Sequence, residues 1–338
     1  MVSNVHVVFK ANDRSYFAIL KKEIHALAKQ AGLSDKRTGE ADLVVAEMAT
    51  NLVKHGGGGQ LLVKIIEQNK TPGIEIISID NGPGMVDVNK MIADGTSTKQ
   101  TLGLGLGTMK RLSNFFQVYS LKDWGTIIVA RVFAKEFPPF QKPPRAEIRS
   151  IVIPKPGETA CGDGFYYTST KDHIKVFLGD GLGHGIEAED VVQKAGAAFM
   201  ECEETNPCEI IRYLNASVRK TRGLVGSVGV FTISEKVWRL CGVGNIATRI
   251  SGPSFLKNYL AYNGIIGLNV PKTLNTQEVP YEKGQTLIFC SDGIKSRWDL
   301  LKYTAITRYD PSILCAAVLK DFGRNTDDTS VAAIKINY

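Results

Sequence analysis

Apolar residues recur at three- and four-residue steps in the first part of the chain, which predicts helices. The clearest row, Phe17, Leu20, Ile24, Leu27 and Ala31, ends at Gly32, a residue typical of helix ends. Further helices are predicted over residues 39–54 and 105–114. Runs rich in β-branched residues predict strands over residues 5–10, 60–68, 73–80 and 124–133. Helices combined with an antiparallel sheet indicate an α+β sandwich.

The second part of the chain is dominated by short apolar runs. Helices are expected over residues 185–202, 207–220 and 311–322 only. Many short strands with few helices favour a two-sheet β core with flanking helices. The predicted strands are residues 148–154, 164–170, 173–180, 228–234, 236–244, 247–252, 285–292 and 330–336.

A proline-rich stretch separates the two parts. FPPFQKPPRAE, residues 137–147, holds four prolines, which exclude a helix or a central strand and predict a stiff linker. We therefore expect a first domain over residues 1–137, a linker over 138–147 and a second domain over 148–338.

Composition and charge exclude several classes of protein. Hydrophobic residues make up 43% and charged residues 22%, as in ordinary globular domains. No apolar run is long enough to predict a membrane span, and no secretory signal opens the chain. Six widely spaced cysteines without a C-x-x-C pair indicate reduced thiols in a cytoplasmic protein without a zinc site. The net charge of +7 is shared between both parts, so no basic arm for nucleic acid is expected.

Residue types suited to nucleotide binding follow one another in the first part. Glu47 and Asn51 lie four residues apart in EMATNLVKH and so share one face of the predicted helix. A carboxamide oxygen together with phosphate oxygens suits Mg²⁺. A predicted strand then runs into Asp80, and Gly82 and Gly84 allow the backbone to approach whatever that carboxylate holds.

A glycine-rich run, GLGLG, precedes the third predicted helix with Gly103, Gly105 and Gly107. It is neither a P-loop, since no Gly-Lys-Ser/Thr follows, nor a dinucleotide fingerprint, since Thr108 stands where the third glycine belongs. In their order and on their elements, these motifs resemble the GHKL ATPase and kinase superfamily. The resemblance covers nearly all of residues 1–137. It is closest to the small bacterial anti-sigma-type serine kinases.

This resemblance implies a GHKL α/β sandwich that binds ATP with Mg²⁺. Glu47 would be the general base, Asn51 would hold Mg²⁺, and Asp80 would bind the adenine amino group with support from Thr126. The glycines would hold the triphosphate through backbone amides, together with the following helix N-terminus. They are Gly82, Gly84, Gly103, Gly105 and Gly107.

Acidic residues mark the strand ends of the second part. Asp180 and Asp292 each end an apolar strand in Asp-Gly, Asp163 lies in CGDGFYY, and Asp327 with Asp328 precedes the last strand. Carboxylates without nearby histidine or thiolate suit Mg²⁺ or Mn²⁺ rather than zinc. Two such ions can lower the pKa of a shared water toward ~7, which allows phosphoester hydrolysis without a protein nucleophile.

The segments CGDGFYY, LGDGLGHG, CGVGNIATRI, YNGIIGL and NTDDTSVAAI, in this order, resemble the SpoIIE-like branch of the PPM-type phosphatases. The resemblance covers roughly residues 148–338 and implies a PPM-type αββα sandwich with two Mn²⁺ or Mg²⁺ ions. Asp180 would bridge both ions with help from the Gly181 carbonyl. Asp292 and Asp327 would complete the ligands of one ion, and Asp163 would complete those of the other. Asp328 is the weaker choice of the Asp327–Asp328 pair.

Both resemblances together predict a bifunctional protein serine/threonine kinase and metal-dependent phosphatase. Its substrates would be STAS-domain partners in a bacterial stressosome or partner-switching system, a class implied by the resemblance alone. In the alternative, the second part is a phosphatase and the first is a non-catalytic module. That module would sense ATP or bind a sigma factor or a second phosphatase. The partner's identity, the direction of the switch and the oligomeric state stay open at this point.

Overall fold

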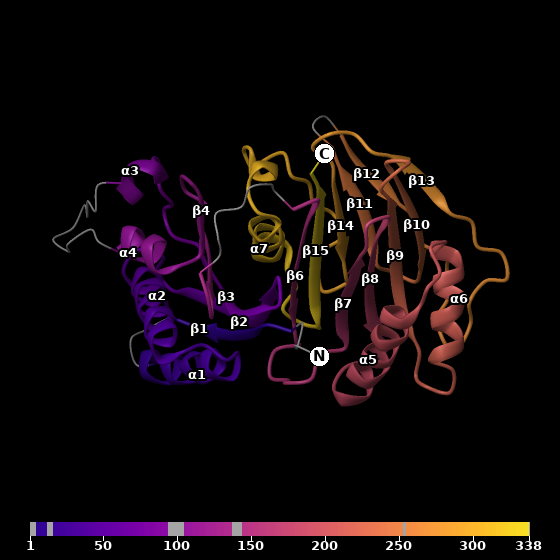
Figure 1. Ribbon diagram of the computed structural model, residues 1–338, viewed down its shortest axis with the longest axis horizontal. Coiled ribbons are helices and arrows are strands. Elements are labelled where there is room, and N and C mark those ends of the chain that lie inside the picture. The colour runs from indigo at the N-terminus through magenta and orange to yellow at the C-terminus, as the bar shows by residue number, and fades with distance from the viewer. Residues whose placement is uncertain (1–4, 12–15, 94–104, 137–143, 253–254, 338) are drawn as a thin grey trace. The chain divides into compact units, whose positions relative to one another are not determined.

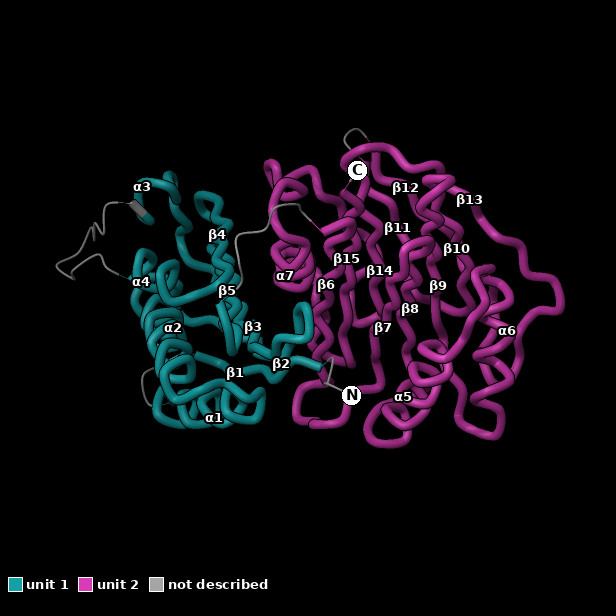
Figure 2. The backbone as a smooth tube through the Cα atoms, in the orientation of Figure 1, with its two compact units in different colours: residues 1–142 teal, residues 143–338 magenta. Residues whose placement is uncertain are grey.

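The computed structural model describes residues 5–11, 16–93, 105–136, 144–252 and 255–337. The chain divides into two compact units, residues 1–142 and residues 143–338 (Figure 2). Among the described residues, no helix combines the length and the apolar composition needed to cross a membrane.

The first unit is a five-stranded antiparallel sheet in the order β1-β2-β3-β5-β4, with helices α1 and α2 packed on one face (Figure 1). Buried residues such as Leu20, Ile24, Val44 and Met48 form the core between helices and sheet. The elements are β1 Val7–Lys10, α1 Phe17–Gln30, α2 Asp35–Lys54, β2 Gly59–Gln68, β3 Thr71–Asp80, α3 Val88–Ala93, α4 Gly105–Leu112, β4 Phe115–Leu121 and β5 Gly125–Phe133.

Three details of this unit differ from the sequence prediction. Helix α2 begins four residues earlier than expected, because the Ser34 side chain accepts a hydrogen bond from the Arg37 amide and caps the helix. The turn between β2 and β3 is only Asn69 and Lys70, both with positive φ, so the following Thr-Pro-Gly belongs to β3. The edge strand β4 was not predicted; most of its residues are only half-buried, so the apolar signal is weak.

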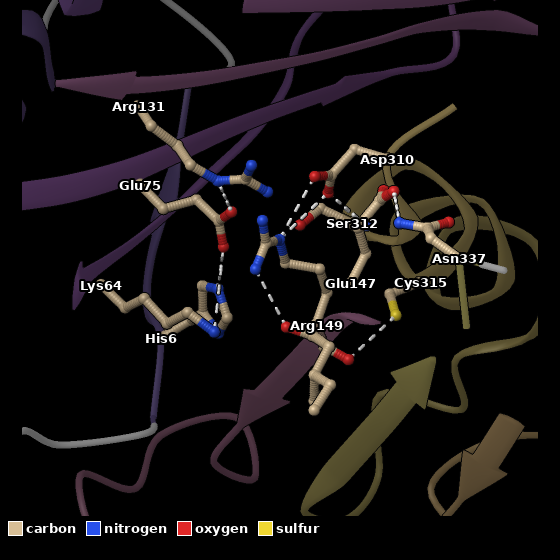
Figure 3. Close-up of polar contacts among 11 residues, drawn as sticks. His6, Lys64, Glu75, Arg131, Glu147, Arg149, Asp310, Ser312, Cys315 and Asn337 are labelled. Atoms are coloured by element: carbon tan, nitrogen blue, oxygen red, sulfur yellow. Dashed lines mark hydrogen bonds and ion pairs between the residues drawn. The ribbon is translucent and has the colours of Figure 1, made fainter. Parts of the chain in front are cut away.

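A buried ionic cluster crosses the sheet of the first unit (Figure 3). Glu75 on β3 pairs with Arg131 on β5 at 2.7 Å and lies 3.8 Å from Lys64 on β2 and 3.7 Å from the ring of His6. Burial alone would raise the pKa of Glu75, but Arg131, His6 and Lys64 hold that pKa well below its usual range. The cluster therefore keeps a charged carboxylate inside the sheet and ties three strands together.

The second unit has two five-stranded sheets, β13-β10-β9-β8-β7 and β12-β11-β14-β15-β6. Every strand pair given for them is antiparallel. The strands are β6 Ala146–Ile153, β7 Asp163–Ser169, β8 His173–Gly181, β9 Leu224–Thr232, β10 Val237–Val243, β11 Ala247–Ser251, β12 Leu256–Tyr259, β13 Gln277–Pro280, β14 Thr286–Cys290 and β15 Thr329–Ile336. The helices are α5 Ile186–Glu201, α6 Pro207–Ser217 and α7 Pro311–Phe322, with a short 3₁₀ turn at Ile306–Arg308.

Helices cover both outer faces of this sandwich (Figure 1). Helices α5 and α6 pack on the first sheet and α7 on the second, while the inner faces meet, for example where Thr248 and Ser227 hydroxyls lie 3.1 Å apart. Helix α7 is capped by Asp310, which accepts from the Ser312 amide and also pairs with Arg149 on β6 (Figure 3). The predicted α+β class, with a helix–sheet–sheet–helix second part, is confirmed.

Two predictions for this unit need correction. Strands β12 and β13 were missed, since each has only four residues and no sustained alternation. The predicted linker ran to residue 147, but β6 begins at Ala146, because this edge of the sheet extends to pair Ala146 with Ile336. Residues 137–143 lie outside the described part of the chain, so the rest of the linker prediction stands as a prediction.

Candidate functional site

Helix α2 presents Glu47 and Asn51 on a half-buried face that adjoins the buried row including Val44 and Met48. Helix α4 begins against this face. A Cβ placed on Gly105 would lie 2.9 Å from Glu47 Oε2 and 4.0 Å from Asn51 Nδ2. The fold thus brings the predicted carboxylate, carboxamide and glycine segment together. Gly103 lies outside the described residues.

Asp80 is the last residue of β3 in the same unit. Its Oδ1 accepts hydrogen bonds from the Gly82 amide at 2.8 Å and from the Thr126 amide at 3.0 Å. Thr126 thus contacts Asp80 through its backbone, while its hydroxyl lies 3.0 Å from Ser120 Oγ. Gly84 has a φ of +70°, and a Cβ there would collide with the Leu121 carbonyl, so the turn after Asp80 requires glycine.

A hollow of about 540 Å³ opens between the C-terminal end of α2 and the turn that follows β3; Asp80 itself does not line it. Glu47 and Asn51 do not line it; they lie on the α2 face beside Gly105. A nucleotide fits this arrangement, because a carboxylate lies next to the hollow and a helix N-terminus lies beside Asn51. The lining residues are Val53, Lys54, His55, Gly56, Gly57, Asn81, Gly82, Pro83 and Asp123.

In the second unit, carboxylates converge at one end of the sandwich. Asp163 on β7 is the direct cross-strand neighbour of Asp180 on β8. Burial, followed by the negative charges of Asp163, Asp292, Asp327 and Asp328 in that order, raises the pKa of Asp180 to about 9. Burial also raises the pKa of Asp163 to about 7, although hydrogen bonds from serine hydroxyls oppose this. Burial and mutual repulsion therefore disfavour the charged forms of these carboxylates more than nearby hydrogen bonds stabilise them.

One carboxylate oxygen in this cluster stands out. Asp163 Oδ2 accepts a hydrogen bond from Ser330 Oγ at 2.8 Å, whereas the buried Oδ1 has no hydrogen-bond partner among the described residues. Such an oxygen among like charges fits a divalent cation, since carboxylates are the ligands that Mg²⁺ and Mn²⁺ prefer. Among the described residues, no three Asp, Glu, His or Cys side chains are arranged so that they could hold a metal ion by themselves. A cation here would therefore rely in part on backbone oxygen and water.

The adjacent residues Asp327 and Asp328 have different surroundings. Asp328 is buried, and its two oxygens accept hydrogen bonds from the Lys155 and Gly162 amides at 2.8 and 2.9 Å. Asp327 is exposed, and its Oδ1 accepts from the Asp328 amide. The geometry favours Asp327 as the cation ligand and gives Asp328 the task of holding two loops.

Glycines let these loops interlock. Gly181 donates its amide hydrogen to the Gly162 carbonyl at 2.8 Å, and a Cβ on Gly181 would lie 2.5 Å from the Ala188 carbonyl oxygen. A Cβ on Gly293, next to Asp292, would lie 2.2 Å from the Asp328 carbonyl oxygen. The predicted Asp-Gly pairs are thus needed for close backbone contact.

Two residues at this site were missed from the sequence. Asn245 donates to Asp292 Oδ2 at 3.1 Å and so orients that carboxylate. Arg222 donates to the Leu182 carbonyl at 2.9 Å and pairs with Glu187, thereby bracing the loop that follows Gly181. The only signal for Asn245 was its place before a predicted strand in CGVGNIATRI. His184 is half-exposed and pairs with Glu158 at 2.6 Å.

The two units match two different families. Residues 9–132 match the family "Histidine kinase-like ATPase domain", and residues 170–337 match "Stage II sporulation protein E (SpoIIE)". The chain is 34% identical over 104 residues to the serine/threonine-protein kinase RsbT of Bacillus subtilis (strain 168), covering 31% of this chain and 78% of RsbT. It is 27% identical over 145 residues to the phosphoserine phosphatase RsbX of the same organism, covering 41% of this chain and 70% of RsbX.

Solved structures agree with this division. One chain, from the work "The bacterial stressosome: a modular system that has been adapted to control secondary messenger signaling", shares 28% identity at a TM-score of 0.54. The match covers 57% of this chain and all of that one. A crystal structure of RsbX in complex with magnesium shares the fold at a TM-score of 0.51 and 20% identity, covering 58% of this chain and 98% of that one. The resemblances drawn from the motifs are thereby confirmed. The chain belongs to the histidine kinase-like ATPase (GHKL) family through its first unit and carries a SpoIIE-type, PPM-class phosphatase domain as its second.

Proposed function

We propose that this protein is a bifunctional switch enzyme that phosphorylates and dephosphorylates serine or threonine on a STAS-domain partner. The phosphatase unit would act with two Mn²⁺ or Mg²⁺ ions and the kinase unit with Mg-ATP. The partner class follows from the likeness to RsbT and RsbX and to a stressosome structure. The proposed domain boundaries are residues 1–137 and 148–338, with β6 of the second domain extending back to Ala146.

The observation that carries the phosphatase assignment is the buried Asp163–Asp180 pair with its unpartnered oxygen. Asp180 would hold both ions with the Gly181 carbonyl, Asp292 and Asp327 would hold one, and Asp163 the other. Asn245 keeps Asp292 oriented, and Asp328 holds both ends of the loop between β6 and β7. When bound, the ions would supply the Lewis acidity that phosphoester hydrolysis needs at neutral pH.

The kinase assignment depends on the contact between α2 and the start of α4. Asn51 would hold Mg²⁺, and Glu47, one turn away on the same face, would accept the proton of the attacking hydroxyl. Asp80 would bind the adenine amino group, as the resemblance implies; Gly82, whose amide donates to Asp80 Oδ1 at 2.8 Å, lines the hollow at the end of α2. The Gly105 and Gly107 amides at the start of α4 would face the triphosphate.

A non-catalytic first unit is the second candidate. It is favoured by one observation: the hollow is lined by Asn81 and Gly82, which follow Asp80 in the chain, and not by Glu47 or Asn51. Nucleotide binding would satisfy that geometry without any transfer to a partner. In this case ATP would act as a signal to the phosphatase, or the unit would bind a sigma factor or a second phosphatase.

The phosphatase assignment is tested with the full chain on a phosphoserine peptide. Activity should require Mn²⁺ or Mg²⁺ and should stop with EDTA. Asp180→Asn should lower kcat at least about 100-fold, since it weakens the ligand shared by both ions. Asp172→Asn, at an exposed turn, is the matched control and should keep full activity. Undiminished turnover in EDTA, or by the Asp180 variant, would refute the two-ion proposal.

A further inference from the structure

Two thiols that are distant in sequence meet in the second unit. Cys208 lies in the first turn of α6 and Cys241 in β10, and both are buried in the same apolar cluster, with exposed fractions of 3% and 2%. Their side chains share a hydrogen bond. The sequence suggested six separate cysteines, but the packing of α6 on β10 brings these two into contact. All six thiols are free.

The surroundings of Cys208 favour its thiolate. The residue occupies the helix N-terminus, where the backbone amides carry positive partial charge, and its own amide donates to Asn206 Oδ1 at 2.8 Å. Interaction with Cys241 above all, and then with Thr276 and Arg212, lowers the pKa of Cys208 to about 6 against the opposing effect of burial. Glu209 opposes this, and the pKa of Cys241 is raised.

The pair lies close beneath the surface. The Cys208 thiol is 3.3 Å from the hydroxyl of half-buried Thr276, which in turn donates to the side chain of exposed Asn206. A chain of polar contacts thus leads from the Cys208 thiol to an exposed residue. The surroundings therefore combine a nucleophilic thiolate, a neighbouring resolving thiol and a short path from solvent.

We propose that Cys208 and Cys241 are a peroxide-sensitive thiol pair that closes to a disulfide linking α6 to β10. The Cys208 thiolate attacks hydrogen peroxide; an S–O bond forms, the O–O bond breaks, and hydroxide leaves and takes up a proton to become water. The Cys241 thiol then attacks the sulfenic acid sulfur; the S–S bond forms, the S–O bond breaks, and a second water leaves with the thiol proton. Two thiols are oxidised by two electrons and one peroxide is reduced to two waters.

The disulfide would act on the helical layer of the phosphatase domain. Helix α6 packs against α5 as well as β10. Helix α5 begins at Ile186, shortly after Gly181, and its Ala188 carbonyl touches that glycine. Fixing α6 to the sheet therefore restricts the layer that supports the acidic loop.

The test treats the reduced full-length protein with hydrogen peroxide, blocks the remaining thiols with iodoacetamide and maps the peptides by mass spectrometry. A crosslinked Cys208–Cys241 peptide, reversed by dithiothreitol, is expected, with Cys161, Cys202, Cys290 and Cys315 alkylated. This measurement needs no variant, so it does not depend on whether a substituted protein folds. Absence of the crosslink at peroxide levels that oxidise the free thiols of the unfolded chain would overturn the proposal.

Variants then assign the two roles. In Cys241→Ala protein, dimedone should trap a sulfenic acid on Cys208, because the resolving thiol is gone. In Cys208→Ala protein, Cys241 should stay unmodified, and Cys202→Ala protein, altered at another buried cysteine, should still form the crosslink. Trapping on Cys241 rather than Cys208, or crosslinking that fails equally in the folded Cys202 variant, would contradict the assignment.

Discussion

At the scale of single residues, neighbouring side chains of one type perform different tasks. The Asp328 carboxylate accepts hydrogen bonds from two backbone amides. Among the hydrogen bonds described, the exposed Asp327 carboxylate accepts only one, from the Asp328 amide. A buried amide that loses its acceptor costs roughly 1–3 kcal/mol. The local hydrogen bonds therefore support the proposal that Asp327 is the ligand and Asp328 the structural residue, in the same sense as the sequence resemblance.

This difference predicts opposite outcomes for two matched substitutions. Asp328→Asn should lower the free energy of unfolding by about 1–3 kcal/mol, because the new amide group opposes a backbone N–H donor. Asp327→Asn should change stability by less than about 0.5 kcal/mol but lower Mn²⁺-dependent turnover at least about 10-fold. Denaturant unfolding and phosphopeptide kinetics measure the two effects. Equal stability losses in both variants would show that the division of tasks is wrong.

At the scale of elements, the nucleotide site depends on how closely α4 approaches α2. A Cβ on Gly105 would lie 2.9 Å from Glu47 Oε2, so the Glu47 carboxylate would have to shift, whereas a Cβ on Gly107 would lie 3.4 Å from Arg111 and 3.5 Å from the Ile92 carbonyl. Alanine is otherwise the better helix former by about 1 kcal/mol. The glycine at position 105 is thus explained by contact between helices and not by helix stability.

Gly105→Ala should therefore push α4 away from Glu47 and weaken Mg-ATP binding at least about 10-fold, a loss of ~1.4 kcal/mol. Gly107→Ala is the matched control within the same helix and should keep the affinity within a few-fold, since its backbone amide is retained. Titration calorimetry measures both. Unchanged ATP affinity in the Gly105 variant would show that this contact does not form the site.

Elements with strong local signals could be predicted from the sequence, and elements defined by pairing could not. The strands ending at Asp80 and Asp180 are long apolar runs, so their carboxylates were placed at strand ends correctly. Edge strands such as β12 exist because a neighbour pairs with them. Asn245 and Arg222 were missed because their partners, Asp292 and Leu182, are distant in sequence and become neighbours only through the fold.

At the scale of the whole molecule, two units with opposing proposed activities share one chain. Strand β5 ends at Phe133 and β6 begins at Ala146, so about a dozen residues connect them. At ~3.1 Å per residue such a proline-rich stretch spans at most roughly 37 Å. A partner bound by one unit therefore meets the other at high effective concentration. This favours action on the same partner, or on partners within one assembly, as a reversible switch.

The most direct test of this account follows the phosphorylation of a partner captured with the full-length protein from its host. With ATP and Mn²⁺ or Mg²⁺, Asp292→Ala protein should leave that partner stably phosphorylated on serine or threonine, because the phosphatase is disabled. Glu47→Ala protein should leave it unphosphorylated, and the unsubstituted protein should give an intermediate level that depends on ATP. If the Asp292 variant binds ATP and the partner but never phosphorylates it, the first unit is a binding module and the bifunctional account is wrong.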